Sequence, residues 1–260
     1  MLLLVAFSCT KNLVTGRKQL NLVSESELQV MALKEYTNFL STNKVLSTSS
    51  NKNAEMVKRV GTKIANGIKT YYDSKGQTSI LEGYKWEFNL VENNDVNAWC
   101  MPGGKVVVYT GLLPITKNEN ALAIVLGHEI AHAVAQHGSE RMSQGLLQQL
   151  GGTALQVALS SKPVETQNLY LAAYGIGSTV GAILPFSRKE ENEADQYGLY
   201  FAAMAGYDPN EAIPFWQRMA STGSSKPPEF LSSHPSDKTR TEKLKANMPQ
   251  AMKYYKTAKK

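Results

Sequence analysis

The sequence predicts an α+β domain that is mainly helical and carries a small antiparallel β-sheet. Three observations predict it: apolar residues recur at helical spacing before residue 72, alternate with polar residues from 84 to 113, and return to helical spacing from Thr116 almost to the end. The chain has 260 residues, 42% hydrophobic and 19% charged, which describes a globular protein rather than a disordered or collagen-like one.

The first ten residues, MLLLVAFSCT, form an apolar run that ends in a small residue and Cys9. This run is similar to the tail of a bacterial lipoprotein signal, so we predict that residues 1–9 are a signal remnant and that Cys9 is lipidated, which would tether the chain to a membrane. The run is too short to span a bilayer. The alternatives are a weakly packed N-terminal segment and a disulfide between Cys9 and Cys100.

Two amphipathic helices are expected before the sheet. The first covers residues 24–40 and begins with a capping box of Ser24 and Glu27. The second covers residues 54–71, where apolar residues recur every three or four positions. The apolar residues of this second helix are Val57, Val60, Ile64 and Ile68.

The sheet is predicted from the alternating stretch. Residues 84–91 place Trp86, Phe88 and Leu90 between polar neighbours, which predicts a strand. Residues 96–113 read as two short strands broken by the turn Pro102-Gly103-Gly104.

A long uncharged stretch follows later in the chain. Residues 169–186 carry no charge over a length close to the minimum for a membrane span. Their glycines, hydroxyl groups and tyrosines favour a buried helix or a helix that lines a cleft.

The charge balance is basic, with 28 Lys and Arg against 22 Asp and Glu and a net charge of +6. Part of the excess lies at the C-terminus, so we separate residues 246–260 as a basic, solvated tail. No stripe of basic and aromatic residues and no nucleic-acid motif accompanies the charge. We therefore interpret the excess as an aid to solubility and expect no nucleic-acid partner.

The helical stretch 121–137 contains Gly127-His128-Glu129-Ile130-Ala131-His132, and we assign its start to a capping box of Thr116 and Glu119. His128 and His132 lie one helical turn apart, so both imidazoles can bind one metal ion. Glu129 projects beside them and can take a proton from metal-bound water. The sequence has only two Cys and four His, which excludes an all-cysteine zinc site.

A zinc hydrolase needs a third protein ligand. His137 would point away from the metal on a continuous helix, so we exclude it as a ligand and interpret it as a helix-end residue that contacts exposed carbonyls. Glu191 and Asp195 share one face of a later helix. Glu191 could bind the metal while Asp195 orients a ligand histidine. From the residues alone, a solvated acidic helix start is an equal alternative.

Two motifs together resemble the M48 metallopeptidase family: HEIAH at residues 128–132 and SRxxExxAD at residues 187–195. The resemblance runs from about residues 15–19 (TGRKQ) through Arg240. It implies a zincin-like (gluzincin) fold, with residues 10–245 as the M48 peptidase domain. It also implies one Zn²⁺ per chain, held by His128, His132 and Glu191.

The resemblance gives roles to two late residues. His234-Pro235, followed by Arg240, is similar to the late His-Pro…Arg motif of the family. His234 is then either a switchable fourth ligand that blocks water or a group that stabilises the tetrahedral intermediate. Arg240 is expected to neutralise the oxyanion or to fix the loop.

The resemblance also marks the substrate side of the site. Asn97-Ala98 followed by the Pro-Gly-Gly turn matches the edge strand beside the active-site cleft in this family. We therefore expect an extended substrate to add as a strand along Asn97, Ala98 and Trp99.

The implied activity is that of a zinc-dependent endopeptidase acting on misfolded or misassembled envelope proteins, with zinc-bound water activated by Glu129. The start of the chain points to the branch of bacterial periplasmic lipoprotein proteases. We thus expect a location in the bacterial cell envelope, facing the periplasm, with the envelope assembly machinery as a candidate partner.

Two other functions remain open. One is a non-proteolytic, chaperone-like assembly factor with a latent or structural zinc site, and the other is a hydrolase of small peptides or of non-peptide substrates. The intact Glu129 argues against the first, because a purely structural site does not need this residue.

Overall fold

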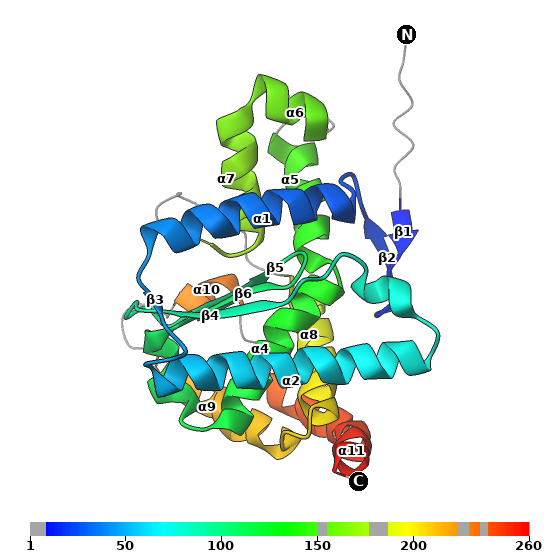
Figure 1. Cartoon of the computed structure of the whole chain (residues 1–260). Coiled ribbons are helices and arrows are strands. Elements are labelled where there is room, and N and C mark those ends of the chain that lie inside the picture. Colours follow the sequence, from blue (N-terminus) through cyan, green and yellow to red (C-terminus); the bar gives the residue numbers. More distant parts are fainter. Residues whose placement is uncertain (1–8, 150–154, 177–186, 223–228, 235–238, 260) are drawn as a thin grey trace.

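The computed structural model describes residues 9–149, 155–176, 187–222, 229–234 and 239–259. The mainly helical α+β class predicted from the sequence is confirmed (Figure 1). The strands are β1 (Cys9–Lys11), β2 (Lys18–Leu20), β3 (Val45–Leu46), β4 (Glu87–Val91), β5 (Ala98–Met101) and β6 (Lys105–Tyr109). The helices are α1 (Glu25–Thr42), α2 (Lys52–Ser74), α3 (Leu113–Thr116), α4 (Glu119–Val134), α5 (His137–Gln149), α6 (Leu155–Ser161), α7 (Pro163–Ala173), α8 (Arg188–Met204), α9 (Ala212–Ser221), α10 (Glu229–Ser233) and α11 (Arg240–Ala258), with the short 3₁₀ turns η1 (Thr78–Leu81), η2 (Thr110–Leu112) and η3 (Pro209–Glu211).

The larger sheet has the strand order β3-β4-β6-β5. The predicted turn joins β5 and β6 as an antiparallel hairpin, and this hairpin places β6, not β5, next to β4. Strands β4 and β6 are therefore parallel, so the sheet is mixed rather than wholly antiparallel. Strand β5 is the last strand in this order, and it lies over α4, which carries the HEIAH motif.

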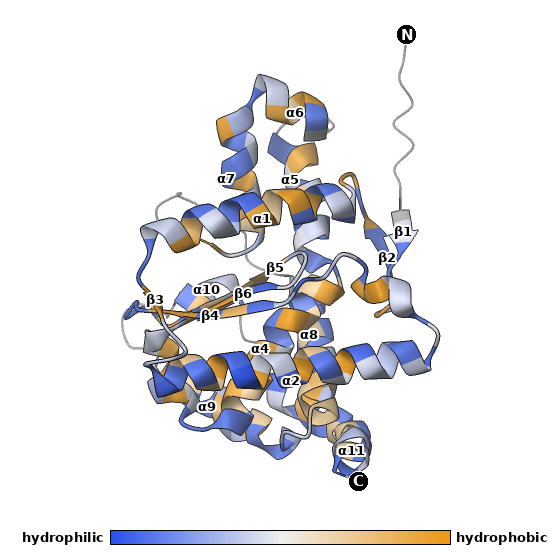
Figure 2. Cartoon of the chain, in the orientation of Figure 1, coloured by the Kyte–Doolittle hydropathy of each residue, from blue (hydrophilic) through white to orange (hydrophobic). Residues whose placement is uncertain are grey.

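Side chains alternate across the sheet and build two cores. On one face, Phe88, Leu90 and Val106 pack with α2, α4 and α8. On the other face, Trp99 and Val107 pack with α1, α5 and α7. Figure 1 shows these helices above and below the sheet, and Figure 2 shows the hydrophobic and hydrophilic bands that alternate along α2.

Of the two capping boxes predicted from the sequence, one is confirmed and one is wrong. Ser24 and Glu27 form the expected capping box of α1. The start assigned to the HEIAH helix is wrong: Asn118 caps α4 and accepts a hydrogen bond from the Ala121 amide. Thr116 instead ends the short helix α3, and its hydroxyl donates to the Leu113 carbonyl.

The N-terminal residues form a second, two-stranded sheet. Strand β1 pairs antiparallel with β2, with Cys9 opposite Leu20, and residues 1–8 of the predicted signal remnant lie outside the described residues. Cys100 of β5 is a buried free thiol whose side chain packs in the core, so the alternative disulfide to Cys9 is not formed.

Other predicted segments differ in extent. Within the uncharged stretch, α7 ends at Ala173, and residues 177–186 lie outside the described residues. Within the residues that the structure describes, every helix is too short or too polar to cross a membrane. Helix α11 continues to Ala258 and buries Ala251, because this face packs against α8, so most of the segment set aside as a tail is part of the packed structure.

Candidate metal centre

The site forms where α4 crosses α8, and two glycines bring these helices together. A Cβ atom added to Gly127 would lie 2.5 Å from the carbonyl oxygen of Gly198, and one added to Gly198 would lie 2.6 Å from the amide nitrogen of His128. Only glycine permits this approach of the two backbones. Side chains on α4 and α8 can therefore meet across the crossing.

Helix α8 begins with a capping box in which Ser187 and Glu190 satisfy each other's amides. From this start, Glu191 and Asp195 lie one turn apart on one face of the helix, as predicted. That face is directed at α4. Both are buried. The alternative of a solvated acidic helix start is wrong for these two residues.

Four side chains converge here: His128, His132, Glu191 and His234 each offer one ligand atom, and these atoms all lie within 4.8 Å of one another. His132 Nε2 lies 3.1 Å from His128 Nε2 and 3.2 Å from Glu191 Oε1. His234 Nδ1 lies 2.9 Å from Glu191 Oε1 and 3.2 Å from His128 Nε2. Imidazole and carboxylate donors in a buried, four-membered group fit a zinc ion.

The other nitrogen of His128 has a carboxylate partner. His128 Nδ1 lies 3.0 Å from Asp195 Oδ1, which is the contact expected of a residue that orients a ligand histidine. Arg240 holds the carboxylates in turn: its Nε donates to Asp195 Oδ2 at 2.6 Å and its Nη2 to Glu191 Oε2 at 3.0 Å. The guanidinium carbon lies 3.6 Å from the ring centre of Trp216.

Glu191 and His132 have pKa shifts that favour the protonation states that metal ligands need. Burial raises the pKa of Glu191, but His234 and His128 outweigh burial and hold it well below its usual range. Burial lowers the pKa of His132 well below its usual value, which favours the neutral imidazole. An ionised carboxylate and a neutral imidazole are the forms that bind metal.

Glu129 lies beside this group and is 3% exposed. Its Oε1 makes no hydrogen bond with any described residue, and His234 Nε2 lies 3.6 Å away. Burial raises the pKa of Glu129 above its ordinary value, although His234 and His128 oppose the shift. A raised pKa makes a carboxylate a stronger proton acceptor, as a general base requires.

His137 is placed differently from the sequence prediction. Helix α4 ends at Val134, and Gln136 takes a left-handed conformation with φ of 57°, so His137 starts a new helix. His137 is outside the four-donor group, as predicted, but its Nδ1 lies 2.9 Å from His132 Nδ1. The single continuous helix predicted from the sequence would not bring these two rings together, whereas the left-handed turn at Gln136 does.

The expected substrate strand is buried, main chain included. Asn97, Ala98 and Trp99 are each 1% exposed, and Trp99 packs edge-on against Phe39 of α1. The side chain of Trp99 is therefore part of a core. Helix α10 meets this strand at its start, where the amide of Phe230 donates to the carbonyl of Val96 at 3.1 Å.

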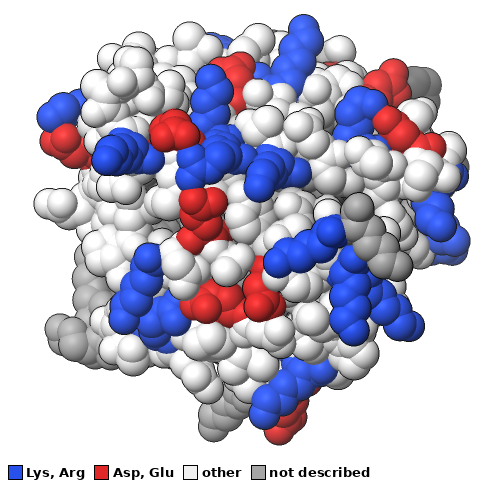
Figure 3. All heavy atoms as spheres, turned by 60° about the horizontal axis from the view of Figure 1, so that its bottom comes forward, with Lys and Arg blue, Asp and Glu red and all other residues white. Residues whose placement is uncertain are grey.

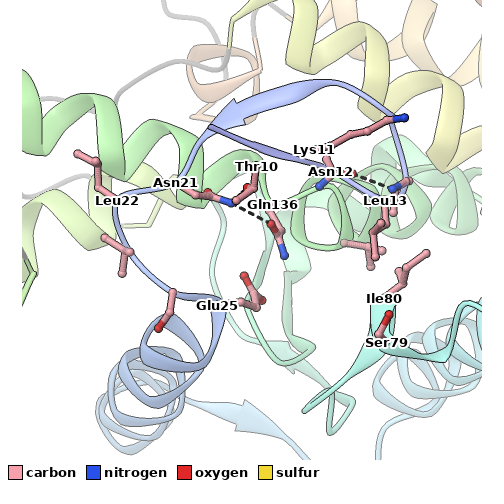
Figure 4. Close-up of a pocket in the computed structure, with 14 residues that line it drawn as sticks. Thr10, Lys11, Asn12, Leu13, Asn21, Leu22, Glu25, Ser79, Ile80 and Gln136 are labelled. Carbon is pink, nitrogen blue, oxygen red and sulfur yellow. Dashed lines mark hydrogen bonds between the residues drawn. The ribbon is translucent and has the colours of Figure 1, made fainter. Parts of the chain in front are cut away.

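A cavity of about 480 Å³ lies at the C-terminal end of α4, between the N-terminal hairpin, the start of α1 and η1 (Figure 4). Glu25, Asn21 and Gln136 contribute polar groups to its wall. It does not include any of the four donor residues. Elsewhere, on the face seen in Figure 3, basic and acidic side chains are interspersed.

Comparison with known proteins places the chain among peptidases. The family model of peptidase family M48 matches residues 52–248. The chain is 40% identical over 190 residues to the mitochondrial metalloendopeptidase OMA1 of Arabidopsis thaliana, which covers 70% of this chain and 36% of that protein. It is 34% identical over 252 residues to human metalloendopeptidase OMA1, 94% of this chain and 45% of that protein.

A bacterial relative is more distant. The beta-barrel assembly-enhancing protease of Yersinia pestis is 33% identical over 156 residues, which covers 58% of this chain and 32% of that protein. The chain thus spans between about a third and a half of the length of these curated relatives.

These comparisons overturn the expected location in the bacterial cell envelope, because the relatives of higher identity are named as mitochondrial proteins of eukaryotes. The short apolar start of the chain was too small a signal to decide a compartment. Lipidation of Cys9 stays a prediction.

Proposed function

The chain belongs to peptidase family M48, and from this membership and the geometry of the metal centre we propose that it is a zinc-dependent endopeptidase. The observation that carries the proposal is the buried four-donor group with Glu129 beside it. A structural zinc site has no need of a fifth, catalytic carboxylate next to its ligands, whereas a hydrolase does.

Zinc would be held by His128, His132 and Glu191. When bound, the ion supplies a Lewis acid that polarises the scissile carbonyl and makes water more acidic. Asp195 keeps His128 in the tautomer whose Nε2 faces the site, since Nδ1 is engaged by the carboxylate. Arg240, 4% exposed and bonded to both carboxylates, holds Glu191 and Asp195 in place.

Glu129 acts as the general base. It takes a proton from the water that attacks the peptide carbonyl carbon, and it delivers this proton to the amide nitrogen as the C–N bond breaks. The products are a carboxylic acid, which releases its own proton at neutral pH, and an amine that carries the proton taken from the attacking water. Two observations support this role: Oε1 of Glu129 makes no hydrogen bond with any described residue, and the pKa of Glu129 is raised.

His234 would close the site at rest. With His234 included, four protein donors surround one point, whereas a catalytic zinc site keeps a position open for water or substrate. His234 follows α10 directly, and α10 is bonded to the backbone of Val96 at the start of the edge strand. A substrate that pairs with this strand would compete with α10 and so displace His234.

The substrate would be an extended polypeptide. Because Asn97, Ala98 and Trp99 are buried, main chain included, recognition along β5 would require α10 to move aside; it would then use main-chain hydrogen bonds, which favour unfolded segments over folded domains. Misfolded or misassembled proteins present such segments. The restriction to envelope proteins depended on the location that the comparisons overturn.

The test compares wild type with Glu129→Gln for zinc content and for cleavage of casein. We expect equal zinc in both proteins, cleavage by wild type, and a loss of about 100-fold or more in the variant. Equal cleavage by both proteins would contradict the mechanism.

The second candidate is a chaperone-like factor with a latent or structural zinc site, which the four-donor group favours. It would be supported if neither wild type nor His234→Ala cleaves casein while both bind the unfolded protein. Cleavage by His234→Ala alone would identify wild type as a latent peptidase.

A further inference from the structure

The N-terminal hairpin reaches the metal centre from outside the residues that the family model matches. Strands β1 and β2 and their loop precede residue 52, where that match begins. They lie against the junction of α4 and α5, as Figure 4 shows for Asn12, Asn21 and Gln136. This junction is the turn that brings His137 to His132.

The hairpin is fastened to the junction by several hydrogen bonds. The side-chain amides of Asn12 and Gln19 both donate to the carbonyl of Ala135, each at 2.9 Å. Ala135 immediately precedes Gln136, whose left-handed conformation redirects the chain. A non-glycine residue rarely adopts this conformation without support from its surroundings. The hairpin supplies that support.

Arg17 in the hairpin loop extends the contact to α8. Its Nε donates to Glu193 Oε1 at 2.9 Å, and its two terminal nitrogens donate to Glu140 at 2.7 and 2.6 Å. Glu193 Oε2 lies 3.0 Å from His137 Nε2. The Arg17 side chain is 13% exposed and that of His137 is fully buried.

These contacts form one continuous chain of hydrogen bonds from His132 through His137 and Glu193 to Arg17. One proton arrangement satisfies every step: His132 Nδ1–H donates to His137 Nδ1, and His137 Nε2–H donates to Glu193. It directs the unprotonated Nε2 of His132 at the metal centre. Glu193 accepts from both sides, because its Oε1 also takes the hydrogen bond from Arg17 Nε.

We propose that Arg17 is a positioning residue of the metal centre, which fixes the ligand His132 through Glu193 and His137. His132 thereby has a support equivalent to the one that Asp195 and Arg240 give His128. In both cases an arginine holds a carboxylate. The inference rests on the metal centre of the proposed function, and it makes the N-terminal hairpin a part of that centre.

The test measures zinc affinity by competition with a chelator for wild type, Arg17→Gln and Arg17→Lys. Loss of a residue that orients a ligand histidine commonly weakens metal binding by 10- to 100-fold, and for this more remote residue we expect about tenfold in Arg17→Gln and partial rescue in Arg17→Lys. Arg59→Gln is the matched control, because Arg59 likewise joins two glutamates, Glu55 and Glu119, on the surface.

A second readout separates positioning from stability. At saturating Co²⁺, the visible absorption of Arg17→Gln should differ from that of wild type and of Arg59→Gln, since it reports the geometry of the bound ligands. Unchanged zinc affinity and an unchanged spectrum in Arg17→Gln would overturn the inference. If that variant does not fold, Glu193→Gln, which keeps the size of the side chain, takes its place with the same expectations. Failure of wild type to bind zinc would instead refute the proposed function.

Discussion

Gly127 of α4 and Gly198 of α8 approach so closely that a Cβ atom on Gly127 would lie 2.5 Å from the Gly198 carbonyl oxygen. The contact is between backbones, with no flexible side chain to move aside. Gly127 lies one residue before His128, and Gly198 lies three residues after Asp195. The distance between the two ligand-bearing helices is therefore fixed next to the donors themselves.

Gly198→Ala should separate the helices. The added methyl meets the His128 backbone, which costs about 1–3 kcal/mol of strain, while the gain in helix propensity returns at most about 1 kcal/mol. We expect a lower free energy of unfolding in urea and a weaker zinc affinity. Gly145→Ala is the control, because its methyl meets only the end of the Leu169 side chain, so its zinc affinity should equal that of wild type.

Much of this site follows from local sequence patterns. The spacing of His128 and His132 and the shared helix face of Glu191 and Asp195 each depend on residues within one or two helical turns, and the structure brings His128, His132 and Glu191 together. Helix geometry alone determines which residues of such a pattern lie together, so these patterns can be predicted from a single sequence.

The residues that were missed depend on non-local contacts. Gln136 is not a residue type that marks a left-handed turn, and the hairpin amides that hold this turn come from residues more than 110 positions earlier. The role of His137 could therefore not be read from its spacing to His128. The parallel pairing of β4 with β6 has the same origin, because it depends on which strand of the hairpin docks.

His234→Ala should retain zinc, since His128, His132 and Glu191 remain, and should cleave casein faster than wild type. The gain would be about tenfold if about one wild-type molecule in ten has His234 displaced. Steady-state kinetics measure it, and the double variant Glu129→Gln/His234→Ala must be inactive if the activity comes from this site. A slower His234→Ala would assign His234 to stabilisation of the tetrahedral intermediate, and an unchanged rate would exclude both roles.

Removal of the metal should destabilise the whole domain, because the donors come from α4, α8 and the residue after α10. A ligand held at 100 times its Kd stabilises the folded state by about 2.7 kcal/mol. For a domain of this size, we expect chelation to lower Tm by roughly 5–10 °C. Differential scanning calorimetry before and after EDTA measures the shift, and added zinc, but not magnesium, should reverse it. An unchanged Tm after verified metal loss would contradict a metal centre that joins these elements.

Glu25 gives the protein a pH dependence that is separate from the metal centre. Its side chain lies in the wall of the cavity beside the N-terminal hairpin (Figure 4), and burial raises its pKa to about 7, against a smaller opposing effect of Gln29. Between about pH 4.5 and pH 7 the unfolded chain releases this proton while the folded protein retains it. The folded state therefore loses stability as the pH rises through this window, and the loss is complete above pH 7.

Glu25→Gln removes this titration, so the variant should gain stability relative to wild type between pH 5 and pH 8. The residue is half-buried, and we expect the gain to be about 1–3 kcal/mol. Urea unfolding at the two pH values measures it. Glu165→Gln is the control: Glu165 also stands in the first turn of a helix, α7, but is exposed, so its stability difference from wild type should be the same at both pH values. An equal difference at both pH values for Glu25→Gln would show that the Glu25 carboxyl titrates alike in the folded and unfolded chain.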